Sequence, residues 1–275
     1  KRFKMNNNLY LFTFFITTFS FSQVILEEID LPKEINETSG LEYHDNFLIT
    51  LNDSGNDPIL YYLNDSGKII KNRQFFGIDN NDWEDLTSDD KHIYIADIGN
   101  NFDIRKNLSI IKVNKNEEIK NIEHISFNYP EQKSFSFKKL SMFDAEALIS
   151  IKDYLLIFTK NRAKKITDIY RLPKIPGNYN AKKIGSLDVK SIITAADYNE
   201  NSRLLVLTST INFDLYYIII IENFTIDLSN IKIKMYEIPV GKTQIESIKI
   251  IDSSTFWLTS EHEKNGNPKL YKLKI

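Results

Sequence analysis

Two stretches decide the fold: residues 81–86 read Asn-Asp-Trp-Glu-Asp-Leu, and residues 93–101 read Ile-Tyr-Ile-Ala-Asp-Ile-Gly-Asn-Asn. An acidic and aromatic turn leads into a short apolar strand, which ends in an oxygen-rich cluster around a glycine. The same pattern returns in weaker form along the chain. Such recurrence predicts a repeat fold, and it indicates where a polar site lies more clearly than what that site does.

Five segments carry a carboxylate at their second or third position and a large apolar residue at their fourth. Each is followed by short strands rich in Ile, Leu, Tyr, Phe and Val, with almost no helical periodicity after residue 22. The segments begin at Gly40, Trp83, Ala145, Ala195 and Ile245. A four-stranded propeller blade takes about 40–50 residues, which these intervals match, apart from a polar insertion around residues 131–139.

The sequence therefore predicts an all-β fold, a single β-propeller of five four-stranded blades over residues 24–275, with six blades as the alternative count. The fifth repeat ends before its fourth strand. A strand at 24–31 is expected to supply it, closing the ring and hiding two sheet edges. A β-sandwich or two barrels is the alternative architecture, and five recurring four-strand units argue against it.

Residues 1–22 differ in composition from the rest of the chain. Three positive charges at residues 1–4 precede an apolar run over residues 9–21, and small residues follow it. This is the pattern of a secretory signal peptide, for which Met5 offers an alternative start. The run is too short for a bilayer span, which takes about 20 residues. We therefore expect export to the periplasm, the cell surface or the medium, with no membrane span in the mature chain.

Composition narrows the function classes. The formal net charge is −2 and the lysines are scattered along the chain, so neither nucleic acid nor an anionic membrane is expected as a partner. The absence of cysteine excludes a thiol nucleophile and thiolate metal ligands, and four histidines argue against a multi-histidine zinc site. A monomer is the expected state.

The carboxylates of the repeats are expected to meet. The first strand of each propeller blade lines the central channel, so equivalent positions converge at one mouth. The inner-strand acids expected there are Glu42, Glu84 or Asp85, Glu146, Asp197 and Glu246. The ends of the second strands add Asp53, Asp97, Lys160, Ser209 and Ser260, and Asn100 lies in the turn that begins at Asp97. In the turns at 52–56 and 97–101, glycine is expected to permit a left-handed or tight backbone.

Converging carboxylates repel one another unless a cation lies among them or some are protonated. Calcium takes six to eight oxygen ligands, so Asp, Glu and Asn without sulfur or imidazole suit it better than zinc. Fixed counter-charges from Lys160 and Arg105, or raised pKa values, are alternatives. A further alternative is that these acids are solvated turn residues without a ligand.

We assign roles to these residues on the hypothesis that the site binds calcium. The metal ligands are Glu42, Asp53, Asp85, Asp97, Asn100, Asp197 and Glu246. Glu84 and Glu146 are the candidate catalytic carboxylates, with Lys160 and Arg105 offsetting anionic charge. The predicted function is metal-dependent hydrolysis of a phosphoester, lactone or ester. The alternative is a non-catalytic module that binds a small molecule or glycan at the channel mouth, with a structural ion or none.

The motifs also support a resemblance. At residues 82–85, at 97–101 with Arg105, at 144–148 with Lys160 and at 194–198, the chain resembles a widespread group of secreted bacterial β-propeller proteins. The resemblance covers nearly the whole mature chain and implies a propeller and export, without an activity. In architecture and residue type, the chain is also similar to five-bladed calcium-activated nucleotidases and to the six-bladed regucalcin and gluconolactonase family. Unlike the nucleotidases, it shows no basic cluster for nucleotide phosphates.

Overall fold

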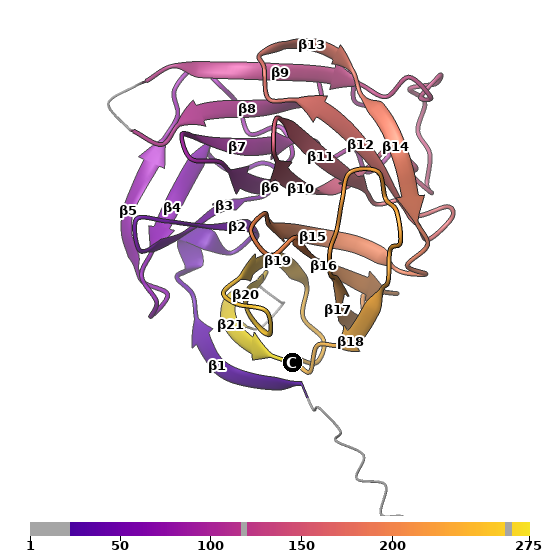
Figure 1. The fold of residues 1–275 in the computed structure, drawn as a ribbon. Helices are drawn as coiled ribbons and strands as arrows, with labels where there is room; N and C mark the ends of the chain where they lie inside the picture. Colours follow the sequence, from indigo (N-terminus) through magenta and orange to yellow (C-terminus); the bar gives the residue numbers. More distant parts are fainter. Residues whose placement is uncertain (1–22, 117–119, 262–265) are drawn as a thin grey trace, which may run out of the picture.

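The computed structural model describes residues 23–116, 120–261 and 266–275, and the predicted signal peptide at 1–22 lies outside these residues. Five sheets surround a common axis, with the first strand of each sheet innermost (Figure 1). Neighbouring inner strands contact one another around the whole ring, from the first to the fifth and back to the first. The structure therefore confirms an all-β propeller of five blades.

Each blade is an antiparallel meander, running outward from the axis. Blade 1 contains β2 (Thr38–His44), β3 (Phe47–Asn52), β4 (Ile59–Leu63) and β5 (Ile69–Gln74). Blade 2 contains β6 (Trp83–Ser88), β7 (His92–Asp97), β8 (Ser109–Asn114) and β9 (Ile122–Asn128). Blade 3 contains β10 (Ala145–Ile151), β11 (Tyr154–Thr159), β12 (Thr167–Pro173) and β14 (Lys182–Leu187).

The last two blades complete the ring. Blade 4 contains β15 (Ile192–Asn199), β16 (Leu204–Ile211), β17 (Leu215–Ile221) and β18 (Lys234–Glu237). Blade 5 contains β19 (Ile245–Ile250), β20 (Thr255–Ser260), β21 (Lys269–Lys274) and β1 (Val24–Asp30). β1 pairs antiparallel with β21, so the N-terminal strand closes the ring as expected. A 3-10 turn, η1 (Lys33–Ile35), follows β1.

One strand crosses between blades. β13 (Gly177–Asn180) leaves the connection between β12 and β14 and pairs in parallel with β9. Blade 2 therefore has five strands, and a strand from blade 3 covers its outer edge (Figure 1). An exposed edge offers unpaired backbone groups to other chains, and β13 removes that opportunity here.

Every inner strand has a β-bulge near its start. The bulged residues are Gly40, Glu84, Glu146, Thr194 and Glu246. The bulged residues occupy equivalent positions in the five blades. The acids that the sequence alignment matched by residue type do not. The sequence alignment is therefore wrong by one residue in blade 1 and by two in blade 4, which changes where Glu42 and Asp197 lie along their strands.

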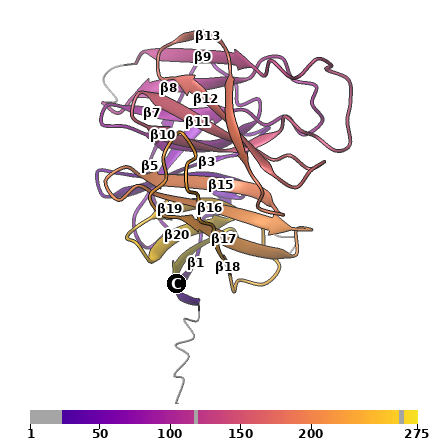
Figure 2. The same ribbon diagram turned by 45° about the vertical axis from the view of Figure 1, so that its right-hand side comes forward.

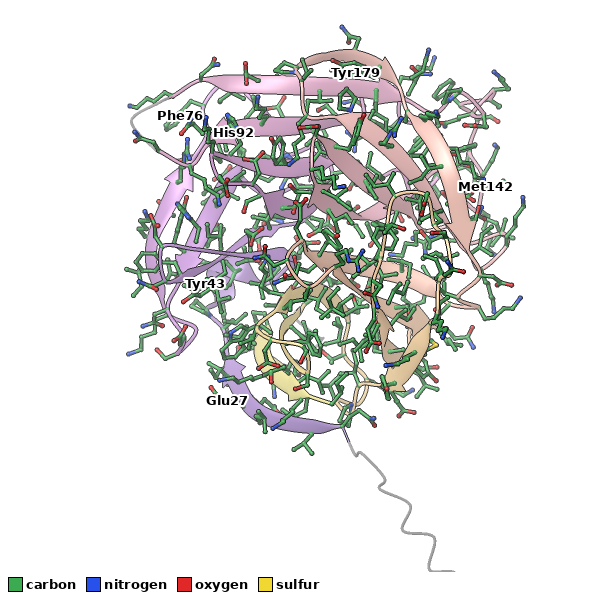
Figure 3. All side chains as sticks on the ribbon, in the orientation of Figure 1. Glu27, Tyr43, Phe76, His92, Met142 and Tyr179 are labelled. Atoms are coloured by element: carbon green, nitrogen blue, oxygen red, sulfur yellow. The ribbon has the colours of Figure 1, made fainter. Side chains whose placement is uncertain are left out.

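Apolar side chains fill the space between neighbouring blades (Figure 3). Trp83 is fully buried there, with its ring edge on Phe75 at 6.4 Å between centroids. Strands buried on both faces read as continuous apolar runs, as in residues 218–221 of β17. Within the described residues, no helix is long and apolar enough to cross a membrane.

Candidate functional site

Three bulged glutamates, Glu84, Glu146 and Glu246, meet at one mouth of the channel. They line a cavity of ≈ 240 Å³. The other lining residues are Ser39, Asp53, Asn101, Lys160, Arg162, Phe213, Gln244 and Glu261. Asp82 and Asp144 lie directly behind the cavity, each two residues before its bulged glutamate. We call the acidic side chains Asp53, Asp82, Glu84, Asp144, Glu146, Glu246 and Glu261 the acidic mouth.

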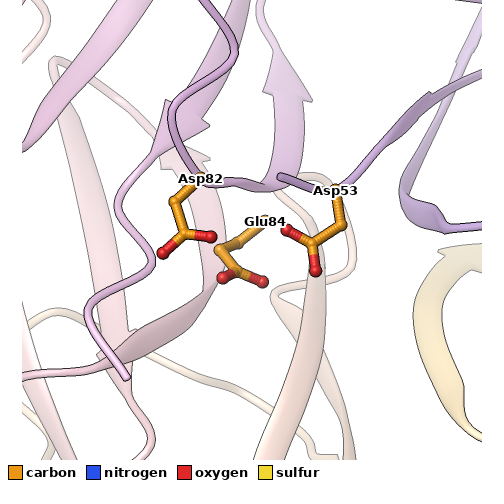
Figure 4. A group of neighbouring side chains, drawn as sticks. All are labelled: Asp53, Asp82 and Glu84. Atoms are coloured by element: carbon orange, nitrogen blue, oxygen red, sulfur yellow. The ribbon is translucent and has the colours of Figure 1, made fainter. Parts of the chain in front are cut away.

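Two groups of three carboxylates in the acidic mouth are spaced to hold a metal ion, and they share Glu84. Oxygens of Asp53, Asp82 and Glu84 lie within 4.8 Å of one another (Figure 4). Oxygens of Glu84, Asp144 and Glu146 do the same. Two ligands of one calcium ion, each at 2.3–2.6 Å, are separated by no more than about 5 Å. Both groups therefore fit a cation of this kind.

The protein's own cations neutralise only one of these groups. Lys160 Nζ lies 2.6 Å from Glu146 Oε1, and Arg162 Nη2 lies 3.0 Å from Asp144 Oδ2. Among the described residues, the ion pair of the group formed by Asp53, Asp82 and Glu84 is a long one, with Arg105 Nη1 3.8 Å from Asp82 Oδ2, and Lys160 acts on Asp53 from further away. The buried Glu84 carboxylate has other acids as its strongest charge neighbours, Glu146 and Asp53 first. This group is the better cation site.

Gly99 makes room for the carboxylates. A β-carbon at this position would lie 2.1 Å from Glu84 Oε1 and 2.4 Å from Asp82 Oδ2, so only glycine leaves both side chains in place. Its backbone is outside the left-handed region. The expected left-handed turn is found instead at Gly55, where φ is +79°. The two glycines of the motifs thus have different functions.

Burial and mutual repulsion raise the pKa values of the acidic mouth. Burial, followed by the charges of neighbouring acids, raises the pKa of Asp82 to about 6 and that of Glu261 to about 8. Burial raises the pKa of Glu146 to about 7 although Lys160 opposes the shift. Burial, and then the charges of Glu146 and Asp53, raise the pKa of Glu84 well above its ordinary range. Without a metal ion, the mouth therefore holds protons near neutral pH.

Asp97, Asn100 and Arg105 form a scaffold behind the mouth. Asp97 Oδ1 accepts hydrogen bonds from Arg105 Nη2 at 2.7 Å and from the Asp82 backbone N–H at 3.1 Å. Arg105 Nη1 donates to the Gly99 carbonyl at 2.7 Å, and Asn100 Oδ1 accepts from the Arg105 N–H. These side chains fix the positions of Asp82 and Gly99 and do not line the cavity.

Asp85 lies deeper in the channel wall. Its two oxygens accept the backbone N–H groups of Leu86 and Leu148, each at 2.8 Å, and so connect β6 to β10. Burial raises the pKa of Asp85 well above its ordinary range, although these hydrogen bonds oppose the shift. It is not part of either group spaced to hold a metal ion.

Glu42 and Asp197 do not reach the acidic mouth. Lys249 Nζ lies 2.5 Å from Glu42 Oε1 and 2.9 Å from Asp197 Oδ1, and all three are largely buried. Burial opposes ionisation of Glu42, but Lys249 lowers its pKa, whereas burial raises that of Asp197. Glu42 and Lys249 line a separate cavity of ≈ 530 Å³. We call these three side chains the Lys249 clamp, and the expected single ring of acids is thus divided.

The sequence assignments missed Asp82, Asp144, Glu261 and Arg162 as members of the site. A signal was present, because Asp82-Trp83-Glu84 and Asp144-Ala145-Glu146 share an Asp-x-Glu pattern, and Gln244-Ile245-Glu246 differs from it only by glutamine in place of aspartate. Blades 1 and 4 lack this pattern. The sequence pattern alone therefore distinguishes the three bulged glutamates from Glu42 and Asp197.

No protein-family model and no curated protein matches this chain. Among solved structures, it is similar to the PQQ-bound aldose sugar dehydrogenase of Streptomyces coelicolor, at 11% identity and a TM-score of 0.53, over 92% of this chain and 98% of that chain. The apo AztD of Citrobacter koseri matches at 9% identity and a TM-score of 0.42, over 80% of this chain and 67% of that one. At these identities the first match shows the propeller fold alone.

Proposed function

We propose that the acidic mouth binds one calcium ion at Asp53, Asp82 and Glu84 and that the protein is an exported hydrolase of small anionic substrates, a phosphoester, lactone or ester. One observation carries this proposal. Three carboxylates from two blades meet without a matching cation at the edge of a cavity that also presents Lys160 and Arg162. Oxygen-only donors favour calcium over zinc.

A divalent cation there supplies electrostatic polarisation of a substrate oxygen, or a bound water of lowered pKa. Glu146, with its pKa raised to about 7, is suited to accept a proton from water near neutral pH. Lys160, which pairs with Glu146, and Arg162 offset anionic charge on the substrate. Arg105 acts by holding Gly99 and Asp97 in place.

Thermal unfolding tests the ion. Chelator is added first, and then calcium, magnesium or zinc. At a hundredfold excess over its dissociation constant, calcium is expected to raise the melting temperature by about 5–10 °C. Glu84→Gln should abolish this rise, and Glu42→Gln, from the Lys249 clamp, should keep it. An unchanged calcium response in Glu84→Gln would overturn the assignment.

Turnover tests the reaction separately. Phosphoesters, lactones and esters are screened with calcium present. Glu146→Gln is expected to lose turnover by about 10²–10⁴-fold, the range for a general base, while keeping the calcium-induced rise in melting temperature. Turnover that survives both Glu84→Gln and Glu146→Gln would contradict the proposed site.

The cavity volume favours a second candidate. At ≈ 240 Å³ it is smaller than the ligand pockets of about 300–1,000 Å³ found in most proteins. This suits a non-catalytic surface module in which the ion is structural and a small molecule or glycan binds at the rim. It predicts the same calcium-induced rise in melting temperature with no turnover of any screened substrate.

Export, a monomeric state and membership of the secreted propeller group with the Asp-Trp-Glu-Asp and Asp-Ile-Gly-Asn-Asn motifs are further parts of the proposal. They rest on the residues of the N-terminus and of the motifs. Fractionation of the source cells, with an antibody against the propeller, tests export. Light scattering of the purified chain tests the monomer.

A further inference from the structure

Two loops at the same end of the propeller as the acidic mouth are built as one unit. The loop at 98–108 joins β7 to β8, and the loop at 129–144 joins β9 to β10. Long loops project beyond the strand ends beside β9 (Figure 2). The fully buried Asp103 accepts hydrogen bonds from Ser141 Oγ at 2.7 Å and from the Phe143 N–H at 2.9 Å. The Lys138 N–H donates to the Phe102 carbonyl at 3.0 Å.

Several apolar side chains of this unit are exposed to solvent. Phe137 is 67% exposed and Leu140 is 60% exposed. Ile104 and Phe102 are exposed as well, and the Phe102 and Phe137 rings stack at 4.7 Å between centroids. Because hydrogen bonds to Asp103 fix both loops, the exposed rings are a built feature of the surface. Such an apolar patch on a soluble domain marks an interaction surface.

Exposed lysines occur in the same two loops as the rings. Lys106 Nζ lies 5.1 Å from the centre of the Phe135 ring, and Lys133 and Lys139 are exposed. Glu131 is the exposed acid of these loops, because Asp103 is buried. Lys106 and Phe135 thus come from different loops and meet in the folded protein. We call Phe102, Ile104, Phe135, Phe137 and Leu140, with these lysines, the Phe137 surface.

The residue types favour one class of partner. Protein interfaces are enriched in aromatic residues, Phe included, but are depleted in lysine, so the lysines distinguish the Phe137 surface from a typical protein interface. At a lipid surface, Phe, Ile and Leu enter the acyl boundary while lysine side chains extend to anionic headgroups. We propose that the Phe137 surface docks the propeller on an anionic lipid bilayer.

The predicted leader does not account for such docking. β1 begins at the opposite mouth, where Val24 pairs with Lys274, and Lys274 pairs with Thr255 at the start of β20. An attachment through the N-terminus would therefore bring the other end of the molecule to the membrane. The orientation of the bound protein therefore distinguishes docking through the Phe137 surface from attachment through the N-terminus.

The test places a reporter at each end of the full chain. Phe137→Trp is compared with Ile175→Trp, which is exposed to a similar degree, 65%, at the opposite mouth. Trp83 and Trp257 are buried and give a constant background. Vesicles of phosphatidylglycerol and brominated phosphatidylcholine are expected to quench Phe137→Trp by about twofold and to leave Ile175→Trp unchanged. Vesicles of brominated phosphatidylcholine alone are expected to quench neither.

A second variant tests the lysines. Lys133→Gln with Lys139→Gln should weaken vesicle binding by roughly thirtyfold, since each lysine near an anionic surface contributes about fivefold. Equal quenching of both reporters, or none of Phe137→Trp, would overturn the proposal. So would a Phe137→Ser variant that loses a protein partner from an exported-protein extract while Phe137→Trp is not quenched by vesicles.

Discussion

The acidic mouth and the Lys249 clamp use the same side-chain types in opposite ways. In the clamp, one buried ammonium contacts two carboxylates at 2.5 and 2.9 Å, and the charges are largely matched within the protein. In the mouth, seven acids lie near three cations, Lys160, Arg162 and Arg105, and the nearest charges to the Glu84 carboxylate are other acids. Carboxylates on the axis of a propeller are therefore either part of its framework or available to an ion, and the nearest cation decides which.

The largest expected effect is a difference in stability between a Lys249 variant and a Lys160 variant. Lys249→Met leaves Glu42 and Asp197 buried without a counter-charge, and breaking such a pair typically costs about 3–5 kcal/mol. Lys160→Met removes the partner of Glu146 in a cavity that water reaches, so the loss of stability should be smaller, and added calcium should restore it. Chemical denaturation of both variants measures the difference, and equal losses would show that the two regions are alike.

A pH dependence follows from the raised pKa values of the mouth. Asp53 and Glu261 have folded-state pKa values of about 6 and about 8, above their ordinary values of 3.8 and 4.5. Each contributes stability below pH 4 that is lost as pH rises toward 8. In chelator, the free energy of unfolding should therefore fall by about 4 kcal/mol between pH 5.5 and 8, or by about 8–16 °C in melting temperature.

Calcium should reverse this trend, because binding releases the protons and becomes tighter as pH rises. Melting curves with and without calcium at both pH values give the measurement. A calcium response independent of pH would mean that the ion binds elsewhere. In Glu261→Gln, the dependence on pH in chelator should be reduced and the calcium response kept.

The two motif glycines provide a third test. Gly99→Ala places a β-carbon against the flexible ends of Glu84 and Asp82, so these side chains must move, and calcium affinity should fall by about tenfold, or about 1.4 kcal/mol. Gly55→Ala has open space but a positive φ, so it should cost about 1 kcal/mol of stability and leave calcium affinity unchanged. Calorimetric titration and denaturation of both variants distinguish the outcomes.

The smallest effect concerns Asp85. Asp85→Asn replaces an oxygen that accepts a backbone N–H by an amide that cannot accept it, at a cost of about 1 kcal/mol. Because Asp85 connects β6 to β10 away from the metal-spaced groups, the calcium response should not change. Chemical denaturation with and without calcium measures this. If calcium no longer stabilises Asp85→Asn, Asp85 is a calcium ligand after all.

The repeats predicted the fold because each blade needs the same apolar strands between the same turns. They predicted the site less well, and the reason lies in the bulges. Where an Asp-x-Glu pattern was absent, the sequence alignment moved to the nearest acid, Glu42 or Asp197. Backbone register determines which neighbour a side chain contacts, and this register cannot be deduced from residue types alone. The partnership of Lys249 with Glu42 spans almost the whole chain, so no local pattern could reveal it.

The closure of blade 5 by β1 also governs how the molecule can be made. β1 is the first described strand to be synthesised, yet its partner β21 is the last. The ring stays open, with β1 and the outer edge of β20 unpaired, until β21 is available. Pairing between such distant segments is slow because the closing loop is long. A chain that leaves the ribosome before residues 269–274 are added therefore has four complete blades, the β19–β20 pair and an unpaired β1, and cannot close the propeller.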